Sequence, residues 1–409
     1  MLTDVQVEDA LDIVLRSVSR LGEEKRHILD CLGSVLAEDV EADMDVPPFD
    51  NSAMDGYAVI SADTTAARPE RPVSLRVVAD LPAGRFPLQP IRSGETMRIM
   101  TGAPMPPGAD AVIRSEEIKR GEGVVWIAKP VPRGNDVRRA GEDVRRGDAV
   151  LREGTLVRAS EVGMLATLGR KEARVFRAPR VAILATGDEL VEPDEPVMPG
   201  KIRNSNLYSI SAQVMASGAR PLLLGVARDT EAELEEKVNR GSAEADVLIT
   251  SGGVSVGDFD MVKTILARMG EILFWRVKMR PGAPVTFGLI RGKPMFGLPG
   301  NPTASMVAFE QFVRPAILKM SGRTRLRRRE VEATLDGSIK NRMGFRNFVR
   351  AVATEKNGEW LARPAGAQGS GILRTMVQAN ALLVVPETVE RLQTGDRVRV
   401  QLLDLPEIE

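Results

Sequence analysis

An apolar segment that leads into a glycine-rich loop constrains the fold of this chain more than any other part. Val247–Ile249 is a short apolar run, the loop after it carries Gly252 and Gly253, and Asp258 stands where a helix can begin. Glycines let successive backbone N–H groups converge, and a helix N-terminus adds further N–H groups and a favourable dipole. The segment therefore predicts a strand, an anion-binding loop and a helix, with carboxylates at the edge of the loop.

The sequence of this loop allows two other interpretations. It can be a tight strand-to-helix turn of a parallel sheet without a ligand. It also matches G-x-S-x-G, the nucleophile turn of a hydrolase, at Gly253–Gly257. That mechanism needs a histidine later in the chain, whereas the single histidine, His27, lies upstream. The hydrolase is excluded, and anion binding remains beside the plain turn.

The composition restricts the chemistry further. With one histidine and one cysteine among 409 residues, a zinc site of the usual nitrogen and sulfur ligands cannot form, so any metal must be bound by oxygen. Mg²⁺ fits this restriction, because it binds to a few carboxylates together with the phosphates of a substrate. The 56 basic residues balance the 56 acidic ones, so no overall positive field favours nucleic acid.

The ends and the cysteine content indicate a compartment. Met1–Val5 lacks the features of a secretory signal, and no run is long and apolar enough to span a bilayer. Cys31 has no second cysteine with which to pair, in keeping with a reducing environment. We therefore expect a cytoplasmic protein with no membrane association. The basic run Arg323–Arg329 is most simply a solvated linker.

The first half of the chain predicts two domains. Apolar residues recur at helical spacing over Val5–Glu38, and a further helix is predicted at Ala159–Leu168. We assign both to a helical and linker domain of residues 1–45 and 137–176. Between them, short alternating runs punctuated by Gly and Pro predict a small β domain over 46–136.

The second half predicts an α/β domain followed by more strands. Strands and helices alternate over 177–322, as expected for a mostly parallel sheet covered by helices on both faces. A strand pattern then returns over 323–409 and predicts a terminal β domain. Ligands of open parallel sheets bind where loops leave the carboxyl ends of the strands. The predicted strands are Val181–Leu184, Pro221–Leu224, Val247–Ile249 and Met295–Phe296, with helices starting near Ser205, Asp229 and Asp258.

Two further loops of the α/β domain lie where a ligand is expected. One carries Asp188 and Glu189 directly after a strand, where Asp188 can either cap a turn or take part in catalysis. In the other, Asn301 suits the N-cap and Pro302 the first position of a helix. That helix is expected to direct free N–H groups to the same pocket.

A set of alternating cations precedes a proline-rich turn. Arg276, Lys278 and Arg280 fall on one face of a strand, and Pro281 follows directly. The cations either face solvent at the edge of the sheet or bind an oxyanion.

Segments of the small β domain complete a recognisable set. In order, the motifs are Ser52–Tyr57, Thr101–Ala103, Gly141–Asp143, Thr186–Leu190, Ser251–Asp260 and Gly297–Pro302. With these six motifs the chain resembles, over essentially its whole length, the molybdopterin molybdenumtransferase family of molybdenum cofactor synthesis. The carboxyl-terminal domain of gephyrin is similar to the same family.

The resemblance implies both an architecture and a reaction. The architecture is multidomain α/β plus β, with a three-layer molybdopterin-binding domain, a small β domain, a helical linker domain and a C-terminal β-barrel-like domain. It implies a homodimer whose active site is shared between two subunits, and transient contact with other enzymes of the pathway. The reaction inserts molybdenum from molybdate into adenylylated molybdopterin, with Mg²⁺-dependent release of AMP.

The resemblance also implies roles for individual residues. Substrate would be bound by a set at the loops of the α/β domain, namely Ser251, Gly252, Gly253, Ser255, Asp258, Pro299, Asn301 and Pro302. Catalysis would depend on Asp55, Thr101, Asp143, Glu189 and Asp260, of which Asp55, Glu189 and Asp260 would also bind Mg²⁺.

Molybdate would be bound by Arg280, Pro284, Arg350 and Ser370. Here the chain departs from the family, because many members have Lys-Pro-Gly-Lys-Pro where this sequence has Arg280 to Pro284 with Ala283 as the fourth residue. The missing cation leaves a tungstate-using counterpart as an alternative. A binding or scaffold paralogue without catalysis is a second alternative, and an adenylyltransferase that uses ATP is a third.

Overall fold

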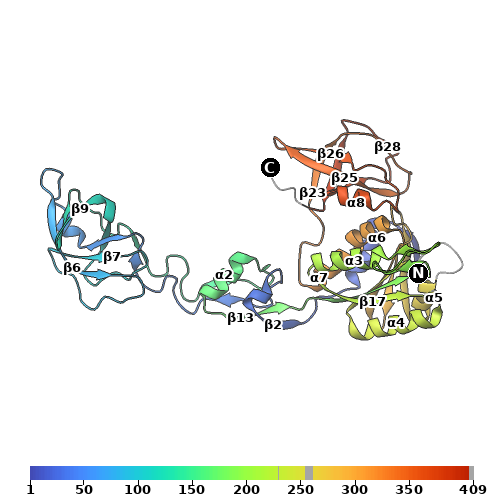
Figure 1. Ribbon diagram of the computed structural model, residues 1–409, viewed down its shortest axis with the longest axis horizontal. Helices are drawn as coiled ribbons and strands as arrows, with labels where there is room; N and C mark the ends of the chain where they lie inside the picture. Colours follow the sequence, from blue (N-terminus) through green and yellow to red (C-terminus); the bar gives the residue numbers. More distant parts are fainter. Residues whose placement is uncertain (229, 254–260, 405–409) are drawn as a thin grey trace. The chain divides into compact units, whose positions relative to one another are not determined.

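The computed structural model describes residues 1–228, 230–253 and 261–404. The chain divides into two compact units (Figure 1). The large unit comprises residues 1–26, 30–37 and 174–409, and the small unit comprises residues 27–29 and 38–173. Each unit has its own sheets and its own hydrophobic core.

A seven-stranded sheet forms the centre of the large unit, in the order β1-β19-β21-β22-β18-β14-β17. The strands β22, β18, β14 and β17 are mutually parallel, and β21 is antiparallel to both of its neighbours. The bounds are β1 Leu2–Val5, β14 Arg180–Thr186, β17 Arg220–Ala227, β18 Val247–Ser251, β19 Gly270–Val277, β21 Thr286–Ile290 and β22 Lys293–Leu298.

Helices cover both faces of this sheet, and the alternation of β14 shows how they are divided. Val181 and Ile183 pack in one core with α1, α3 and the helices that follow β22, whereas Ala182 and Leu184 pack in another with α4 and α5. Figure 1 shows the same three-layer arrangement. The helices are α1 Val7–Arg16, α3 Ser205–Ala216, α4 Glu231–Glu244, α5 Met261–Met269, α6 Pro302–Ala308, the π-helical turn η4 Phe309–Val313 and α7 Arg314–Met320.

Five strands after the α/β segment close into a barrel. Their pairing runs β25-β26-β23-β29-β27 and returns from β27 to β25. Phe348, Leu382 and Val384 of the barrel belong to the core that also holds α1 and α7, so the barrel packs on the helical layer. The strands are β23 Glu330–Leu335, β25 Arg346–Lys356, β26 Glu359–Pro364, β27 Ala381–Val385 and β29 Arg397–Leu402, β20 Met279–Arg280 pairs with β25, and the short helix α8 spans Arg374–Gln378.

The small unit contains a six-stranded sheet in the order β8-β5-β7-β6-β10-β9. Tyr57 and Val59 of β5 face one core and Ala58 faces the other, so the sheet buries side chains on both faces. The strands are β5 Gly56–Val59, β6 Val73–Leu81, β7 Glu95–Ile99, β8 Ala111–Arg114, β9 Ile118–Gly121 and β10 Val124–Ile127.

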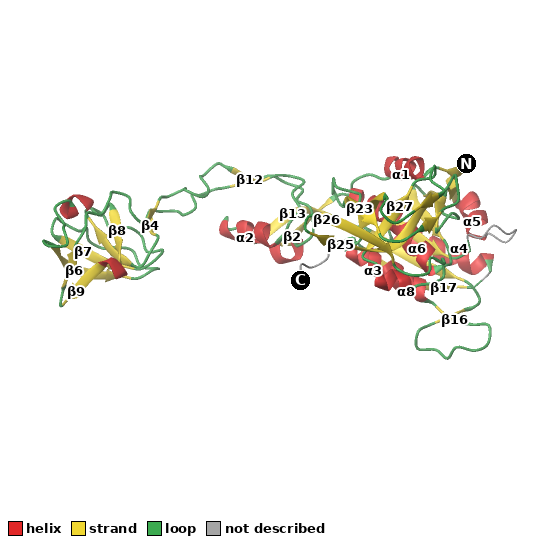
Figure 2. Cartoon of the chain, turned by 90° about the horizontal axis from the view of Figure 1, so that it is seen from above, coloured by secondary structure: helices red, strands yellow, loops and turns green. Residues whose placement is uncertain are grey.

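Short elements complete the chain. The helix α2 spans Ala159–Thr167, and two-stranded pairs join β2 Glu23–His27 with β13 Glu172–Phe176, β3 Val40–Glu41 with β12 Ala149–Leu151, β4 Asn51–Ser52 with β11 Val137–Arg138, and β24 Ile339–Lys340 with β28 Arg391–Leu392. The pair β15 Leu190–Val191 and β16 Ile202–Arg203 closes a loop that projects from the α/β sheet (Figure 2).

Most predicted elements are confirmed, and one is wrong. The predicted strands of the α/β domain fall within β14, β17, β18 and β22, and the helix predicted at Ala159–Leu168 is α2. The helix predicted over Val5–Glu38 ends at Arg16. The next segment is the strand β2, whose residues alternate between exposed and half-buried because they pair with β13, a contact that local periodicity does not reveal.

The position of the N-terminal segment also differs from its prediction. We assigned residues 1–45 to a helical and linker domain, but β1 pairs with β19 and α1 packs on the α/β sheet. The other proposed domain boundaries stay predictions. Within the described residues, no helix combines the length and the apolar character required to cross a membrane.

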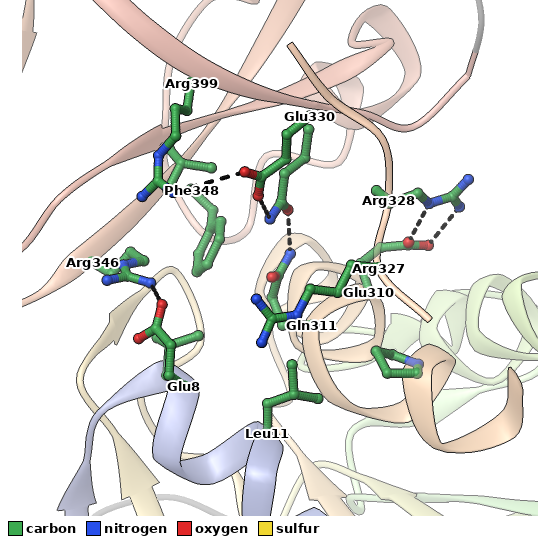
Figure 3. Close-up of a pocket in the computed structure, with 14 residues that line it drawn as sticks. Glu8, Leu11, Glu310, Gln311, Arg327, Arg328, Glu330, Arg346, Phe348 and Arg399 are labelled. Carbon is green, nitrogen blue, oxygen red and sulfur yellow. Dashed lines mark hydrogen bonds and ion pairs between the residues drawn. The ribbon is translucent and has the colours of Figure 1, made fainter. Parts of the chain in front are cut away.

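A small polar cavity of about 80 Å³ separates the barrel from α1 and η4, and we call it the junction cavity (Figure 3). Arg346 of the barrel forms ion pairs with Glu8 of α1 and with Glu387, the latter at 2.9 Å. Arg328 reaches Glu310 of η4 at 2.9 Å. The basic run that we predicted to be a solvated linker is therefore in part a structural contact.

Candidate functional site at the carboxyl ends of three parallel strands

A large cavity lies where β14, β18 and β22 end, and we call it the ligand cavity. Ala185 of β14 is in register with Ser251 of β18, which is in register with Leu298 of β22, so the three following loops leave the sheet at one level. The cavity measures about 870 Å³. Eight predicted site residues line it: Glu189, Ser251, Gly252, Gly253, Pro284, Pro299, Asn301 and Pro302.

The loop after β18 requires its glycines. Gly252 and Gly253 have φ of +92° and +66°. A Cβ on either would lie 3.0 Å from Oγ1 of Thr186, and one on Gly252 would also lie 2.7 Å from the Thr186 carbonyl oxygen. The glycines thus allow the loop to pack against the end of β14. Ser255, Asp258 and Asp260 lie outside the described residues.

The Gly252 N–H group has a partner within the fold. It donates to the Leu298 carbonyl over 3.1 Å, which ties the glycine loop to the end of β22. An anion at this loop would therefore be bound by groups other than the Gly252 N–H. Gly252 itself contributes only the absence of a side chain.

The loop after β14 presents Glu189 to the ligand cavity. Its carboxylate is exposed and folds over the backbone of Gly187, where a Cβ would lie 2.4 Å from Glu189 Oε2. The Ile202 N–H donates to the Glu189 carbonyl over 2.9 Å, and Lys201 Nζ donates to the Asp188 carbonyl over 2.5 Å. The β16 segment therefore fixes the backbone, while the Glu189 carboxylate stays exposed.

The start of α6 corrects one expectation. Asn301 is the N-cap and Pro302 the first helical residue, as predicted, but the Asn301 side chain makes no capping bond. Pro302 has no N–H group, and the N–H of Thr303 donates to the Ser370 carbonyl over 3.1 Å. These first two positions therefore give no free donor to the cavity, because a loop of the barrel satisfies the one N–H that they have.

The predicted molybdate residues divide into two groups. Pro284 lines the cavity, and Ser370 immediately precedes Gly371, which also lines it. Arg280 is exposed at the end of β20 and does not line the cavity. The expected alternation holds, because Val277 and Met279 are fully buried on the other face.

Arg350 lies beneath the loop that carries Ser370. It is 1% exposed, and burial lowers the pKa of its guanidinium to about 10. Its Nη2 donates to the Gly369 carbonyl over 3.0 Å and its Nε to Thr375 Oγ1 over 3.3 Å. These contacts position the loop of residues 369–371 at the cavity, and the guanidinium itself is covered.

Two asparagines of the cavity wall were not predicted. Asn204 caps α3, where its Oδ1 accepts a hydrogen bond from the Leu207 N–H over 3.3 Å. Asn206 Nδ2 donates to Ser251 Oγ and to the Gly300 carbonyl, both over 2.8 Å, and so connects two loops of the site. The signal available in the sequence was the pair of asparagines around Ser205, where a helix was predicted to begin.

The remaining predicted residues belong to the small unit. Asp55 Oδ1 accepts hydrogen bonds from the N–H and the hydroxyl of Thr101, both over 2.7 Å. These bonds lower the pKa of the exposed Asp55 carboxyl, the backbone bond most strongly, so it is ionised at neutral pH. A Cβ on Gly56 would lie 2.1 Å from the Ile113 carbonyl oxygen, so the position after Asp55 requires glycine. Asp143 is exposed, and its N–H donates to the Val46 carbonyl over 3.1 Å.

No cluster of three acidic, histidine or cysteine side chains that suits a metal ion occurs within residues 1–228, 230–253 and 261–404. The exposed carboxylates Glu189 and Asp55 offer oxygen donors only. Such donors fit Mg²⁺, which commonly uses one or two carboxylates together with substrate phosphates.

Comparison with known proteins identifies the family. Three family models match in order: the MoeA N-terminal region (domain I and II) over residues 5–169, a probable molybdopterin binding domain over 182–319 and the MoeA C-terminal region (domain IV) over 332–403. The molybdopterin molybdenumtransferase of Nostoc sp. is 37% identical, over 98% of this chain and 94% of the relative. The chain belongs to the molybdopterin molybdenumtransferase family.

Other relatives agree. The molybdopterin molybdenumtransferase of Bacillus subtilis is 36% identical, over 98% of this chain and 94% of its own. The crystal structure of the molybdopterin biosynthesis MoeA protein from Pyrococcus horikoshii aligns with a TM-score of 0.83 and 33% identity, over 98% of this chain and 99% of that one. The predicted family and the predicted multidomain fold with a terminal barrel are both confirmed.

Proposed function

We propose that this protein is a molybdopterin molybdenumtransferase that inserts molybdenum from molybdate into adenylylated molybdopterin and releases AMP. The observation that carries the proposal is the ligand cavity, in which eight residues from four separate chain segments converge at the ends of parallel strands. A cavity of about 870 Å³ suits a ligand larger than a single small ion. We place this activity in the cytoplasm.

Residue roles follow from the geometry of the loops. The glycine loop would bind the phosphate or diphosphate of the substrate, because Gly252 and Gly253 line the ligand cavity and add no side chain to its wall. Glu189, Asp55 and Asp260, the last of which lies outside the described residues, would hold Mg²⁺, which would neutralise charge on the diphosphate. Without that neutralisation, repulsion between the phosphates and the carboxylates would oppose binding.

We further propose that the active site is shared between two subunits, with Asp55, Thr101 and Asp143 supplied by the second. The Thr101 bonds keep Asp55 ionised and fixed, as a metal-binding or water-orienting carboxylate must be. Molybdate would bind near Pro284 and the loop of Ser370, with Arg280 at the outer edge and Arg350 positioning the loop.

The first experiment measures AMP release from adenylylated molybdopterin with and without molybdate and Mg²⁺. Native protein is expected to release AMP only when both are present, and Glu189→Gln is expected to release it at least ~100-fold more slowly. Replacing molybdate with tungstate tests whether Ala283, where many family members have lysine, changes which oxyanion the protein uses. Tight substrate binding without AMP release by the native protein would contradict the proposed activity.

Mixing two inactive variants tests the shared site. If Asp55 and Glu189 of different subunits meet, Asp55→Asn and Glu189→Gln subunits exchanged at equal amounts should regain about a quarter of native activity, because half of the dimers are mixed and each has one intact site of two. Each variant alone serves as the control. No recovery in proven mixed dimers would show that each subunit builds its site alone.

A further inference from the structure

Three side chains in the wall of the ligand cavity each bury a polar atom that has no hydrogen-bond partner. They are Oγ1 of Thr186, Nδ2 of Asn204 and Oδ1 of Asn206, in residues that are 6%, 1% and 9% exposed. Buried polar groups in folded proteins are paired in the large majority of cases, because leaving one unpaired is costly. Three such atoms around one cavity point to a ligand that completes them.

The amide of Asn206 has a definite orientation. Its Nδ2 donates to the Gly300 carbonyl, which can only accept a hydrogen bond, so the amide cannot be turned around. The Ser251 hydroxyl accepts a second bond from the same nitrogen. The Asn206 Oδ1 is therefore fixed as an acceptor that awaits a donor.

Asn204 is oriented in the opposite sense. Its Oδ1 accepts from the Leu207 N–H at the start of α3, which leaves Nδ2 as a donor without a partner. The two asparagines are two positions apart in the chain and both line the cavity. Together they hold one unpaired acceptor and one unpaired donor, whereas the Thr186 hydroxyl lies against Gly252 and Gly253.

Asn206 Oδ1 is an acceptor, and this limits which part of a ligand can bind beside it. A phosphate oxygen carries negative charge and would be repelled by Asn206 Oδ1, whereas an N–H group of a heterocycle would be bound by it. The phosphate is better placed at the glycine loop, where Gly252 and Gly253 line the cavity without an acceptor side chain of their own. A nitrogen heterocycle with a donor beside an acceptor matches the wall that Asn204 and Asn206 form.

We propose that Asn206 Oδ1 accepts a hydrogen bond from a ring N–H or amino group of the pterin, and that Asn204 Nδ2 donates to the ring acceptor beside it. This inference rests on the proposed function and assigns the pterin edge of the same substrate. Adenine has a similar edge, and the probes below distinguish the two rings. Asn206 is then a specificity-determining residue in addition to its contact with the two loops.

The test measures the binding of three probes to the native full chain and to Asn206→Leu: molybdopterin, AMP and inorganic pyrophosphate. We expect Asn206→Leu to weaken molybdopterin binding about 10- to 100-fold, because the ligand N–H is left without a partner. AMP and pyrophosphate should bind within about twofold of native, since their phosphates use the glycine loop.

Asn341→Leu provides the matched control. Asn341 Oδ1 is also buried without a partner, and its Nδ2 donates to three backbone carbonyls, but the residue follows directly after β24 and does not line the ligand cavity. This variant is expected to lose stability in a thermal unfolding scan while its folded fraction binds molybdopterin normally.

Three results would overturn the proposal. Unchanged binding of every probe would mean that water satisfies Asn206 Oδ1. Loss of AMP binding alone would assign adenine to this wall. Loss of all three probes by folded Asn206→Leu would mean that the residue only positions the Ser251 and Gly300 loops. Native protein that binds molybdopterin through Asn206 but never releases AMP would contradict the proposed function and leave this inference standing.

Discussion

The two cavities of the large unit differ in how their polar walls are satisfied. At the junction cavity, arginines and carboxylates of α1, η4 and the barrel pair with one another (Figure 3). Among the described residues, no buried side-chain nitrogen or oxygen of its lining lacks a partner. At the ligand cavity, Thr186, Asn204 and Asn206 each keep an unpaired buried atom.

This difference separates structural polarity from functional polarity. A polar group that is satisfied within the fold stabilises the contact between elements and needs nothing more. A group that is held in place by the fold but left without a partner lowers stability and is suited to binding. The comparison therefore predicts that substitutions at the two cavities affect different measurements.

The largest effect is expected at the glycine loop. Gly252→Ala places a Cβ 2.7 Å from the Thr186 carbonyl oxygen at a φ of +92°, so the loop must move. We expect affinity for adenylylated molybdopterin to fall at least ~100-fold, measured by equilibrium binding. Gly300→Ala is the control, because its Cβ would meet its nearest neighbour, Gly252 Cα, at an ordinary 3.6 Å. Equal losses in both variants would show that the loop conformation is not what binds substrate.

An intermediate effect, on stability rather than binding, is expected at the junction cavity. Arg346 is largely buried, and its bonds to Glu8 and Glu387 raise the pKa of the guanidinium although burial opposes this. Arg346→Met should lower the free energy of unfolding by ~1–3 kcal/mol, because two carboxylates lose their partner. Denaturant unfolding measures the loss, and substrate affinity should stay within twofold. A variant that keeps its stability but binds substrate poorly would reverse the comparison between the cavities.

Asp55 tests the limit of the comparison, because it is a paired group with a proposed role in catalysis. Thr101→Val removes the hydroxyl bond and keeps the backbone bond, so the pKa of Asp55 should rise part of the way to its ordinary value. Because hydrogen bonds lower the pKa of Asp55 in the folded protein, they stabilise the fold fully above the ordinary carboxyl pKa of about 3.9. This stabilisation is lost as the pH falls through the lowered pKa of Asp55. An NMR titration of the carboxyl carbon measures the shift. No change would show that the hydroxyl does not hold Asp55.

Periodicity and motif spacing predicted much of the α/β domain. The strands and their glycine loop depend on residues that are close in sequence, so Val247–Ile249 was assigned correctly as a strand and Gly252 has the positive φ that a glycine loop requires. The role of Gly252 in binding a ligand stays a prediction. The strand β2 was missed because charged residues there take their conformation from pairing with β13, more than 140 residues away along the chain.

The sequence by itself determined the family, the parallel order of strand and helix, and which loops leave the sheet together, since these follow from local patterns and ordered motifs. Tertiary structure alone decided which polar groups are free. Thr303 and Arg350 are engaged by the loop of residues 369–371, and Asn206 is left with an unpaired acceptor because its amide nitrogen is held by Gly300. Those partners come from distant segments, and a hydrogen bond is settled only when the segments meet in space.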